Sequence, residues 1–103
     1  MIKAAVVSHP SLLTPEDLVK FGESGVPLLL NTCEEDVTFP LDLQQKADEN
    51  IGGGKMETDG YKRLYFAKNK HGFASRGDMN IPHVRKAKEE AFNATVEWFK
   101  KYL

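Results

Sequence analysis

The chain has 103 residues, of which 41% are hydrophobic and 28% are charged, and its formal net charge is −1. This length is enough for one small domain, which we expect to comprise residues 1–103. The near-neutral charge does not favour nucleic acid or an anionic membrane as a partner, and no apolar run is long enough to cross a membrane. A single cysteine cannot form an internal disulfide, and no signal peptide is visible, so we expect a cytoplasmic protein.

The first part of the chain alternates between strand-like and helix-like segments. Residues 2–8 form a nearly continuous apolar run, which predicts a strand covered on both faces. Residues 14–21 predict a short helix, because a threonine cap precedes a proline in the first turn. Residues 26–32 predict a second buried strand, and an acidic loop over residues 33–36 follows it.

The second part continues the alternation. Residues 40–51 predict a helix with apolar positions at i, i+4 and i+8, and consecutive glycines begin a polar loop that lasts to Gly60. Residues 61–66 predict a third strand, whose charged side chains suit the outer edge of a sheet. A long amphipathic helix is expected over residues 82–102. Its apolar stripe is formed by Phe92, Val96, Phe99 and Leu103 and is widened by Ala91, Thr95 and Trp98.

This order of elements predicts an α/β fold: a three-stranded parallel sheet with helices on both faces. The carboxyl ends of parallel strands meet at one edge of the sheet, where ligands bind in folds of this kind. Three polar loops follow the predicted strands, and they carry His9, residues 33–36 and His71. We therefore expect these three loops to lie together.

Asp36 and His71 have the residue types and the order of the last two members of a nucleophile–acid–base triad. His71 precedes Gly72 in a loop between a strand and a helix, where an imidazole can reach solvent and a glycine leaves room for a ligand. No G-x-S-x-G or G-x-C-x-G motif occurs in the 103 residues. The sequence thus predicts an acid and a base without a recognisable nucleophile.

Five motifs together carry a resemblance that covers nearly the whole chain: Val7-Ser8-His9-Pro10-Ser11, Pro27-Leu28-Leu29, Asp36 followed by Phe39-Pro40, His71-Gly72-Phe73-Ala74, and Lys86-Ala87-Lys88-Glu89-Glu90-Ala91 with Trp98-Phe99. In this order and spacing, they resemble the carboxyl-terminal half of the dienelactone hydrolase family, within the α/β-hydrolase fold. The similarity is greatest to fungal members.

The resemblance implies that Asp36 is the orienting acid and His71 the general base of an ester or lactone hydrolase, which acts through an acyl-enzyme. It also implies that Arg76 anchors a substrate carboxylate, although Arg76 stands one residue later than in the bacterial H-x-F-A-R pattern. No cofactor is expected. No metal site is predicted either, because His9, His71 and Asp36 lack the local spacing of a ligand motif.

The amino-terminal half of the family, with its oxyanion loop and nucleophile elbow, has no counterpart in these residues. Cys33 is an alternative nucleophile, because it lies close to Asp36 in the sequence. It can equally be a small buried residue at the end of a strand, the commoner role of a lone cysteine. Without a nucleophile elbow, the isolated chain is expected to be inactive or weakly active.

The strand from Ile2 to Ser8 is internal in the complete family fold, but here it is expected to have one neighbour. An uncharged edge strand presents unpaired N–H and C=O groups, which favour pairing with another chain. We expect either an antiparallel homodimer with a continuous six-stranded sheet or a missing amino-terminal half at this edge. Two functions remain open: a hydrolase fragment that retains the acid and base, and a non-catalytic self-associating module.

Overall fold

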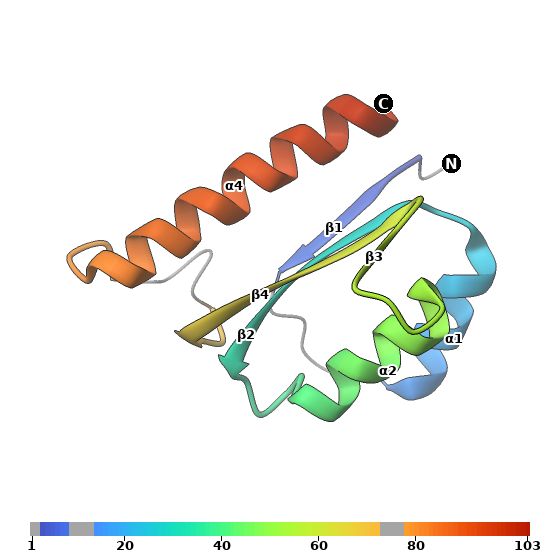
Figure 1. The fold of residues 1–103 in the computed structure, drawn as a ribbon, viewed down its shortest axis with the longest axis horizontal. Coiled ribbons are helices and arrows are strands. Elements are labelled where there is room, and N and C mark those ends of the chain that lie inside the picture. The colour runs from blue at the N-terminus through green and yellow to red at the C-terminus, as the bar shows by residue number, and fades with distance from the viewer. Residues whose placement is uncertain (1–2, 9–13, 73–77) are drawn as a thin grey trace.

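The computed structural model describes residues 3–8, 14–72 and 78–103 of the chain. Strands and helices alternate along most of it, and their colours follow this order in Figure 1. The α/β fold class is therefore confirmed. The elements are β1 (Ala5–Ser8), α1 (Pro15–Ser24), β2 (Leu28–Glu35), α2 (Leu41–Gly52), β3 (Glu57–Thr58), β4 (Tyr61–Lys70) and α4 (Pro82–Tyr102).

The sheet has the strand order β1-β2-β4-β3, and β1, β2 and β4 are parallel as predicted. The prediction of three strands is wrong, because the short β3 pairs antiparallel with the start of β4. Gly60 makes the turn between them with a φ of 87°, and the N–H of Arg63 donates to the carbonyl of Met56 at 2.7 Å. A strand of two residues is too short to show an alternating pattern, so the sequence indicated only a loop.

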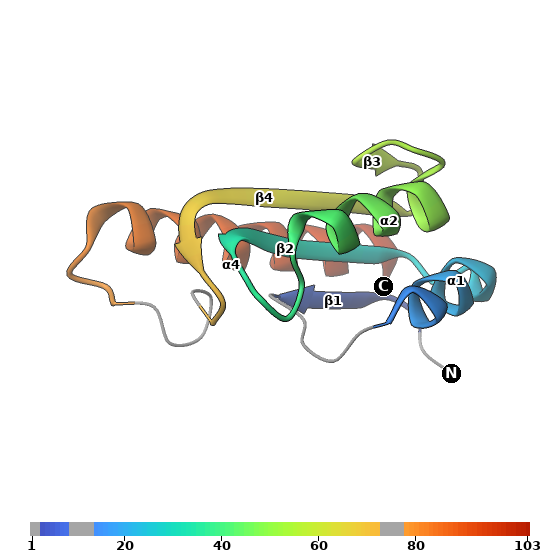
Figure 2. The same cartoon turned by 90° about the horizontal axis from the view of Figure 1, so that it is seen from below.

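Helices cover both faces of the sheet, as predicted. In Figure 2, α1 and α2 lie in front of the sheet and α4 lies behind it. Successive residues of β2 point to opposite faces, which divides the core into two clusters. One cluster lies under α1 and α2 and contains Leu18, Leu28, Leu30, Phe39, Ala47 and Tyr61. The other lies under α4 and contains Cys33, Phe66, Ala87 and Ala91.

Helix α1 begins where the sequence predicts but continues further. Thr14 and Asp17 form a capping box, in which each side chain accepts a hydrogen bond from the other residue's backbone N–H, at 3.2 and 2.9 Å. The helix passes Gly22 and ends at Ser24. A Cβ at Gly22 would lie 2.6 Å from the carbonyl oxygen of Asn50, so this glycine allows α1 and α2 to approach closely. It does not end the helix.

Helix α4 has the predicted extent, and Ala91 and Trp98 of the widened stripe are buried, but Phe92 and Leu103 of the same stripe are exposed. Phe92 is 67% exposed and Leu103 is 74% exposed, whereas the residues that pack most deeply are Ala87, Ala91 and Trp98. Small alanines allow the helix to approach the sheet, and Phe92 is rotated by about 100° from Ala91 on a helix with 3.6 residues per turn. None of the helices in the described part of the chain is long and apolar enough to cross a membrane.

A buried polar network connects α2 to the sheet and corrects the prediction that the charges of β4 lie at an exposed edge. Arg63 is only 5% exposed, and its guanidinium makes two hydrogen bonds to the Asp48 carboxylate, at 2.9 and 2.8 Å. The hydroxyl of Tyr61 donates to the same carboxylate at 2.7 Å. Arg63 also donates to Gln44 at 2.8 Å and to Thr32 at 3.1 Å. This network lies on the face covered by α2.

Candidate active site

The candidate site forms where two neighbouring parallel strands end. Asp36 directly follows the last residue of β2, and His71 directly follows the last residue of β4. Glu35 and Lys70 are paired across the two strands, and the N–H of His71 donates to the carbonyl of Glu35 at 2.9 Å. The fold therefore brings together two residues that are 35 positions apart in the sequence, as the parallel sheet predicts.

An irregularity in β4 sets the position of His71. Cys33 pairs with Phe66, but Glu35 pairs with Lys70, so two steps along β2 correspond to four along β4. Lys68 has a φ of 63° within this bulge. In a regular ladder Glu35 would face residue 68, and His71 would lie about 7 Å further along the strand direction. The bulge thus returns His71 to the level of Asp36, in keeping with the tendency of bulges to re-aim side chains near functional sites.

Asp36 and His71 contact each other directly. Oδ2 of Asp36 lies 2.9 Å from Nδ1 of His71; the Asp36 side chain is 1% exposed and that of His71 is 28% exposed. The other carboxylate oxygen, Oδ1, accepts hydrogen bonds from the backbone N–H groups of Thr38 and Phe39, both at 3.1 Å, and from the Thr38 hydroxyl at 2.7 Å. These donors fix the carboxylate so that Oδ2 faces the imidazole.

The environment of Asp36 favours its ionised form. Burial opposes ionisation, but hydrogen bonds from His71, Thr38 and the Phe39 backbone outweigh burial and hold the pKa of Asp36 below its usual value of 3.8. The carboxylate is therefore charged at neutral pH. A buried, fully hydrogen-bonded carboxylate against one imidazole nitrogen has the geometry of an acid that orients a general base.

We expect this pair to contribute a measurable pH dependence to stability. Because the pKa of Asp36 is lower in the folded than in the unfolded chain, its contribution is complete above about pH 5 and is lost as the pH falls through 3.8 to the folded value. Chemical denaturation between pH 3 and 7 should show that the free energy of unfolding falls less steeply with decreasing pH in Asp36→Asn than in the wild type. Glu35→Gln removes an exposed neighbouring carboxylate and serves as control. Parallel curves for the wild type and Asp36→Asn would contradict this expectation.

An open cleft of about 620 Å³ borders the Asp36–His71 pair. Besides these two residues, three apolar residues line it, Val37, Pro40 and Leu41, and so do three charged residues, Glu34, Glu35 and Lys70. A cavity of this size accommodates a small organic molecule. The cleft thus places the Asp36–His71 pair beside both apolar and charged side chains, in a space large enough for a small ester.

Cys33 lies near the pair, but it is fully buried and packs with Ala87 and Ala91 under α4. Its Sγ is 3.9 Å from Oδ2 of Asp36. Burial, and next the negative charge of Asp36, raise the pKa of the Cys33 thiol to about 12. A nucleophilic cysteine needs its thiolate form, so this environment favours the structural interpretation of Cys33.

Native Cys33 is therefore expected to resist alkylation. At pH 8, a thiol with a pKa of about 12 carries on the order of 10³-fold less thiolate than an unfolded cysteine with a pKa of about 8.5. Iodoacetamide labelling followed by mass spectrometry should be at least that much slower in buffer than in denaturant. Rapid native labelling would show instead that the thiol is accessible and activated.

The remaining predicted residues are placed only in part. His9 and Arg76 lie outside the described residues, so the anchoring role of Arg76 stays a prediction. Within residues 3–8, 14–72 and 78–103, no group of three potential ligands is arranged to hold a metal ion. Sequence reasoning missed Thr38 and Gln44. The spacing Asp36-x-Thr38 is typical of a side-chain-capped turn and could have indicated Thr38, whereas nothing in the sequence indicated Gln44.

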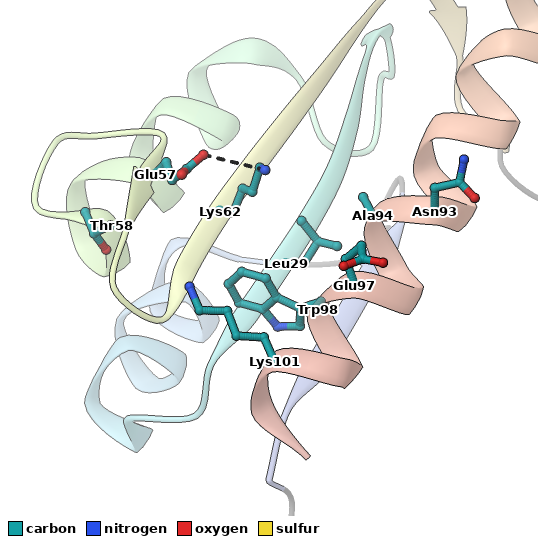
Figure 3. Close-up of a pocket in the computed structure, with 9 residues that line it drawn as sticks. All are labelled: Leu29, Glu57, Thr58, Lys62, Asn93, Ala94, Glu97, Trp98 and Lys101. Carbon is teal, nitrogen blue, oxygen red and sulfur yellow. Dashed lines mark ion pairs between the residues drawn. The ribbon is translucent and has the colours of Figure 1, made fainter.

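A second cavity, of about 370 Å³, lies on the opposite face between the β3–β4 hairpin and α4 (Figure 3). Leu29 and Trp98 form an apolar floor, and Figure 3 shows the ion pair between Glu57 and Lys62, at 3.6 Å, on the hairpin side. Among the described residues that line this cavity there is no histidine, cysteine or serine. The cleft beside Asp36 and His71 is therefore the better candidate for hydrolytic chemistry.

Comparison with protein families identifies the family of the chain. The family model described as the dienelactone hydrolase family matches residues 1–103. The chain belongs to the dienelactone hydrolase family. The resemblance drawn from the five sequence motifs is thereby confirmed, and the Asp36–His71 contact lies in a member of a hydrolase family.

Two fungal relatives are named as hydrolases. Hydrolase pyvD of Aspergillus violaceofuscus is 32% identical over 97 residues, which cover 94% of this chain and 37% of that protein. Hydrolase tropI of Talaromyces stipitatus is 32% identical over 96 residues, which cover 93% of this chain and 35% of that protein. The chain thus spans little more than a third of the length of each of these two relatives. No solved structure matches it at a significant level.

Proposed function

We propose that this chain supplies the acid and the base of an ester or lactone hydrolase, with Asp36 as the orienting acid and His71 as the general base. The 2.9 Å contact between Oδ2 of Asp36 and Nδ1 of His71, at the border of the cleft, carries this proposal. Membership of the dienelactone hydrolase family and the names of the two relatives support a hydrolase-type function.

In the proposed mechanism, Asp36 engages Nδ1 of His71, so proton transfer falls to Nε2. The imidazole takes the proton of an attacking hydroxyl or thiol, which adds to the ester carbonyl, and the resulting imidazolium returns that proton to the departing alcohol. In the second half, His71 takes a proton from water as the water oxygen adds to the acyl-enzyme carbonyl. The imidazolium then returns this proton to the departing nucleophile, and the carboxylic acid is released. Both halves thus use one imidazole, which Asp36 holds in one orientation.

We place the nucleophile outside these 103 residues, because they contain no G-x-S-x-G or G-x-C-x-G motif and because Cys33 is buried in its protonated form. A further part of the same scaffold would supply the nucleophile elbow, which makes the chain a truncated hydrolase. Arg76 is proposed to anchor a substrate carboxylate. We also propose a cytoplasmic location, because the single cysteine of the 103 residues forms no internal disulfide.

Hydrolysis of a p-nitrophenyl ester by the wild type, His71→Ala and Cys33→Ala tests this proposal. Because the acid–base pair alone lacks the covalent step, we expect at most about 10³-fold acceleration over water by the isolated wild type. His71→Ala should return the rate to the uncatalysed background, whereas Cys33→Ala should leave it unchanged. Turnover that does not depend on His71 would overturn the proposal.

A second candidate function is a non-catalytic, self-associating module. In the described part of the chain, β1 lies at the edge of the sheet and pairs only with β2. Beside it, Phe92 is 67% exposed and shares a small surface cavity with Ser8. An open edge strand next to an exposed aromatic side chain is a surface suited to pairing. Antiparallel pairing of two β1 strands would give a homodimer with one continuous sheet, and a missing amino-terminal half would occupy the same edge.

We expect the wild type to elute as a dimer at low micromolar concentration in size-exclusion chromatography with light scattering. Phe92→Ser should weaken the dimer at least about 10-fold, since removing a large buried apolar contact costs 1.4 kcal/mol or more. Leu103→Ser changes another exposed apolar side chain, directly after the last residue of α4, and is the control. A well-folded wild-type monomer would exclude self-pairing. A dimer without His71-dependent turnover would favour the second function.

A further inference from the structure

One buried side chain connects the two ends of the segment that carries Asp36. Gln44 of α2 is 1% exposed, and its Nε2 donates hydrogen bonds to the backbone carbonyls of Cys33 and Phe39, both at 3.0 Å. We call residues 33–39 the Asp36 loop. A single amide group therefore joins the beginning of the Asp36 loop to its end.

The orientation of the Gln44 amide is itself determined by its surroundings. Its Oε1 accepts a hydrogen bond from Nη1 of Arg63 at 2.8 Å, and the Arg63 guanidinium is held by the Asp48 carboxylate. Because a guanidinium can only donate, the amide oxygen must face Arg63 and the amide nitrogen must face the two carbonyls. The arginine–aspartate pair thus acts as the support for the hydrogen bonds that Gln44 makes to the loop.

The contacts of the Asp36 loop lead from Gln44 to the imidazole. Gln44 holds the carbonyl of Phe39, while the N–H groups of Thr38 and Phe39 hold Oδ1 of Asp36. If the Phe39 end of the loop moves, these donors move with it and the carboxylate rotates. Oδ2 then leaves its position 2.9 Å from Nδ1 of His71. A displacement of about 1 Å is enough to impair a catalytic geometry.

We propose that Gln44 is a positioning residue, which sets Asp36 against His71 by clamping both ends of the Asp36 loop. The inference rests on the proposed function for its catalytic meaning, but the geometry it describes can be measured without turnover. A merely structural role would lower the stability of the protein and leave the Asp36–His71 contact intact in the folded fraction. A positioning role alters that contact.

Three variants separate these roles. Gln44→Met keeps the length of the side chain and removes all its hydrogen bonds. Gln44→Glu keeps an acceptor for Arg63, but it replaces the donor to the two carbonyls with a carboxylate oxygen. Gln45→Met changes the exposed neighbouring glutamine and is the matched control. In each variant, nuclear magnetic resonance would record the Nδ1–H proton of His71 and the carboxyl-carbon titration of Asp36, and chemical denaturation would record stability.

We expect Gln44→Met and Gln44→Glu to lose the hydrogen-bonded Nδ1–H resonance and to raise the pKa of Asp36 towards 3.8, and Gln45→Met to do neither. If Gln44→Met does not fold, the signals of Gln44→Glu alone distinguish a positioning role from a merely structural one. Unchanged signals in folded Gln44→Glu would overturn the inference, because they would show that support of Arg63 is what matters. Since no substrate is involved, a failed ester assay would refute the proposed function without affecting this result.

Discussion

Replacing Asp48 with alanine is expected to lower the free energy of unfolding by about 3–5 kcal/mol, the usual cost of removing one partner from a buried ion pair. The variant leaves the Arg63 guanidinium, with a side chain 4% exposed, without its carboxylate. It also removes the acceptor of the Tyr61 hydroxyl, whose hydrogen bond is 2.7 Å long. A small domain has a total stability of only about 5–15 kcal/mol, so the loss is a large fraction of it.

Urea denaturation followed by circular dichroism measures this effect. The control is Glu57→Ala, which breaks the exposed ion pair to Lys62 on the same sheet. The two side chains of that pair are 71% and 37% exposed, and exposed pairs contribute only about 0–1 kcal/mol. If Asp48→Ala lowers the free energy of unfolding as little as Glu57→Ala does, water reaches Arg63 and the network does not act as a buried ion pair.

Replacing Asp36 with asparagine is expected to lower His71-dependent ester hydrolysis by at least about 10²-fold, the lower end of the range attributed to positioned acid–base catalysis, and so to bring the rate close to the uncatalysed background. The carboxylate can only accept a hydrogen bond from Nδ1, which keeps the proton on that nitrogen and leaves Nε2 as the base. An asparagine amide can donate to Nδ1 instead, which moves the proton to Nε2 and removes the basic nitrogen from the reaction.

This prediction has two measurements. Initial rates with a p-nitrophenyl ester give the loss of activity, and ¹⁵N chemical shifts of the His71 ring give the tautomer whether or not turnover is detected. Asp42→Asn, which neutralises an exposed carboxylate in the first turn of α2 that does not line the cleft, should change neither quantity appreciably. A rate and a tautomer that are unaltered in Asp36→Asn would contradict the orienting role of Asp36.

Some features of the site can be predicted from the sequence and others cannot. Asp36 and His71 were found because each polar residue follows a strand-like run, and because parallel strands present their carboxyl ends at one edge. The bulge in β4 was not found, since its two additional residues are polar and resemble the start of a loop. Yet this bulge brings the imidazole to the level of the carboxylate. Local patterns therefore located the pair, and the ladder between β2 and β4 decided its geometry.

By itself, the sequence determined the α/β alternation, the parallel pairing, the extent of α4 over 82–102 and the meeting of Asp36 and His71 at one edge of the sheet. The alternation and the extent of α4 follow from apolar periodicity and local capping, which neighbouring residues express without reference to the rest of the chain. The parallel pairing and the meeting of Asp36 and His71 follow from the order in which strands and helices alternate. Only the tertiary structure decided that Arg63 is buried, that Phe92 is exposed and that Gln44 clamps the Asp36 loop. A buried charge or amide is stable only where another element supplies its partner, and that partner becomes known only when the elements pack together.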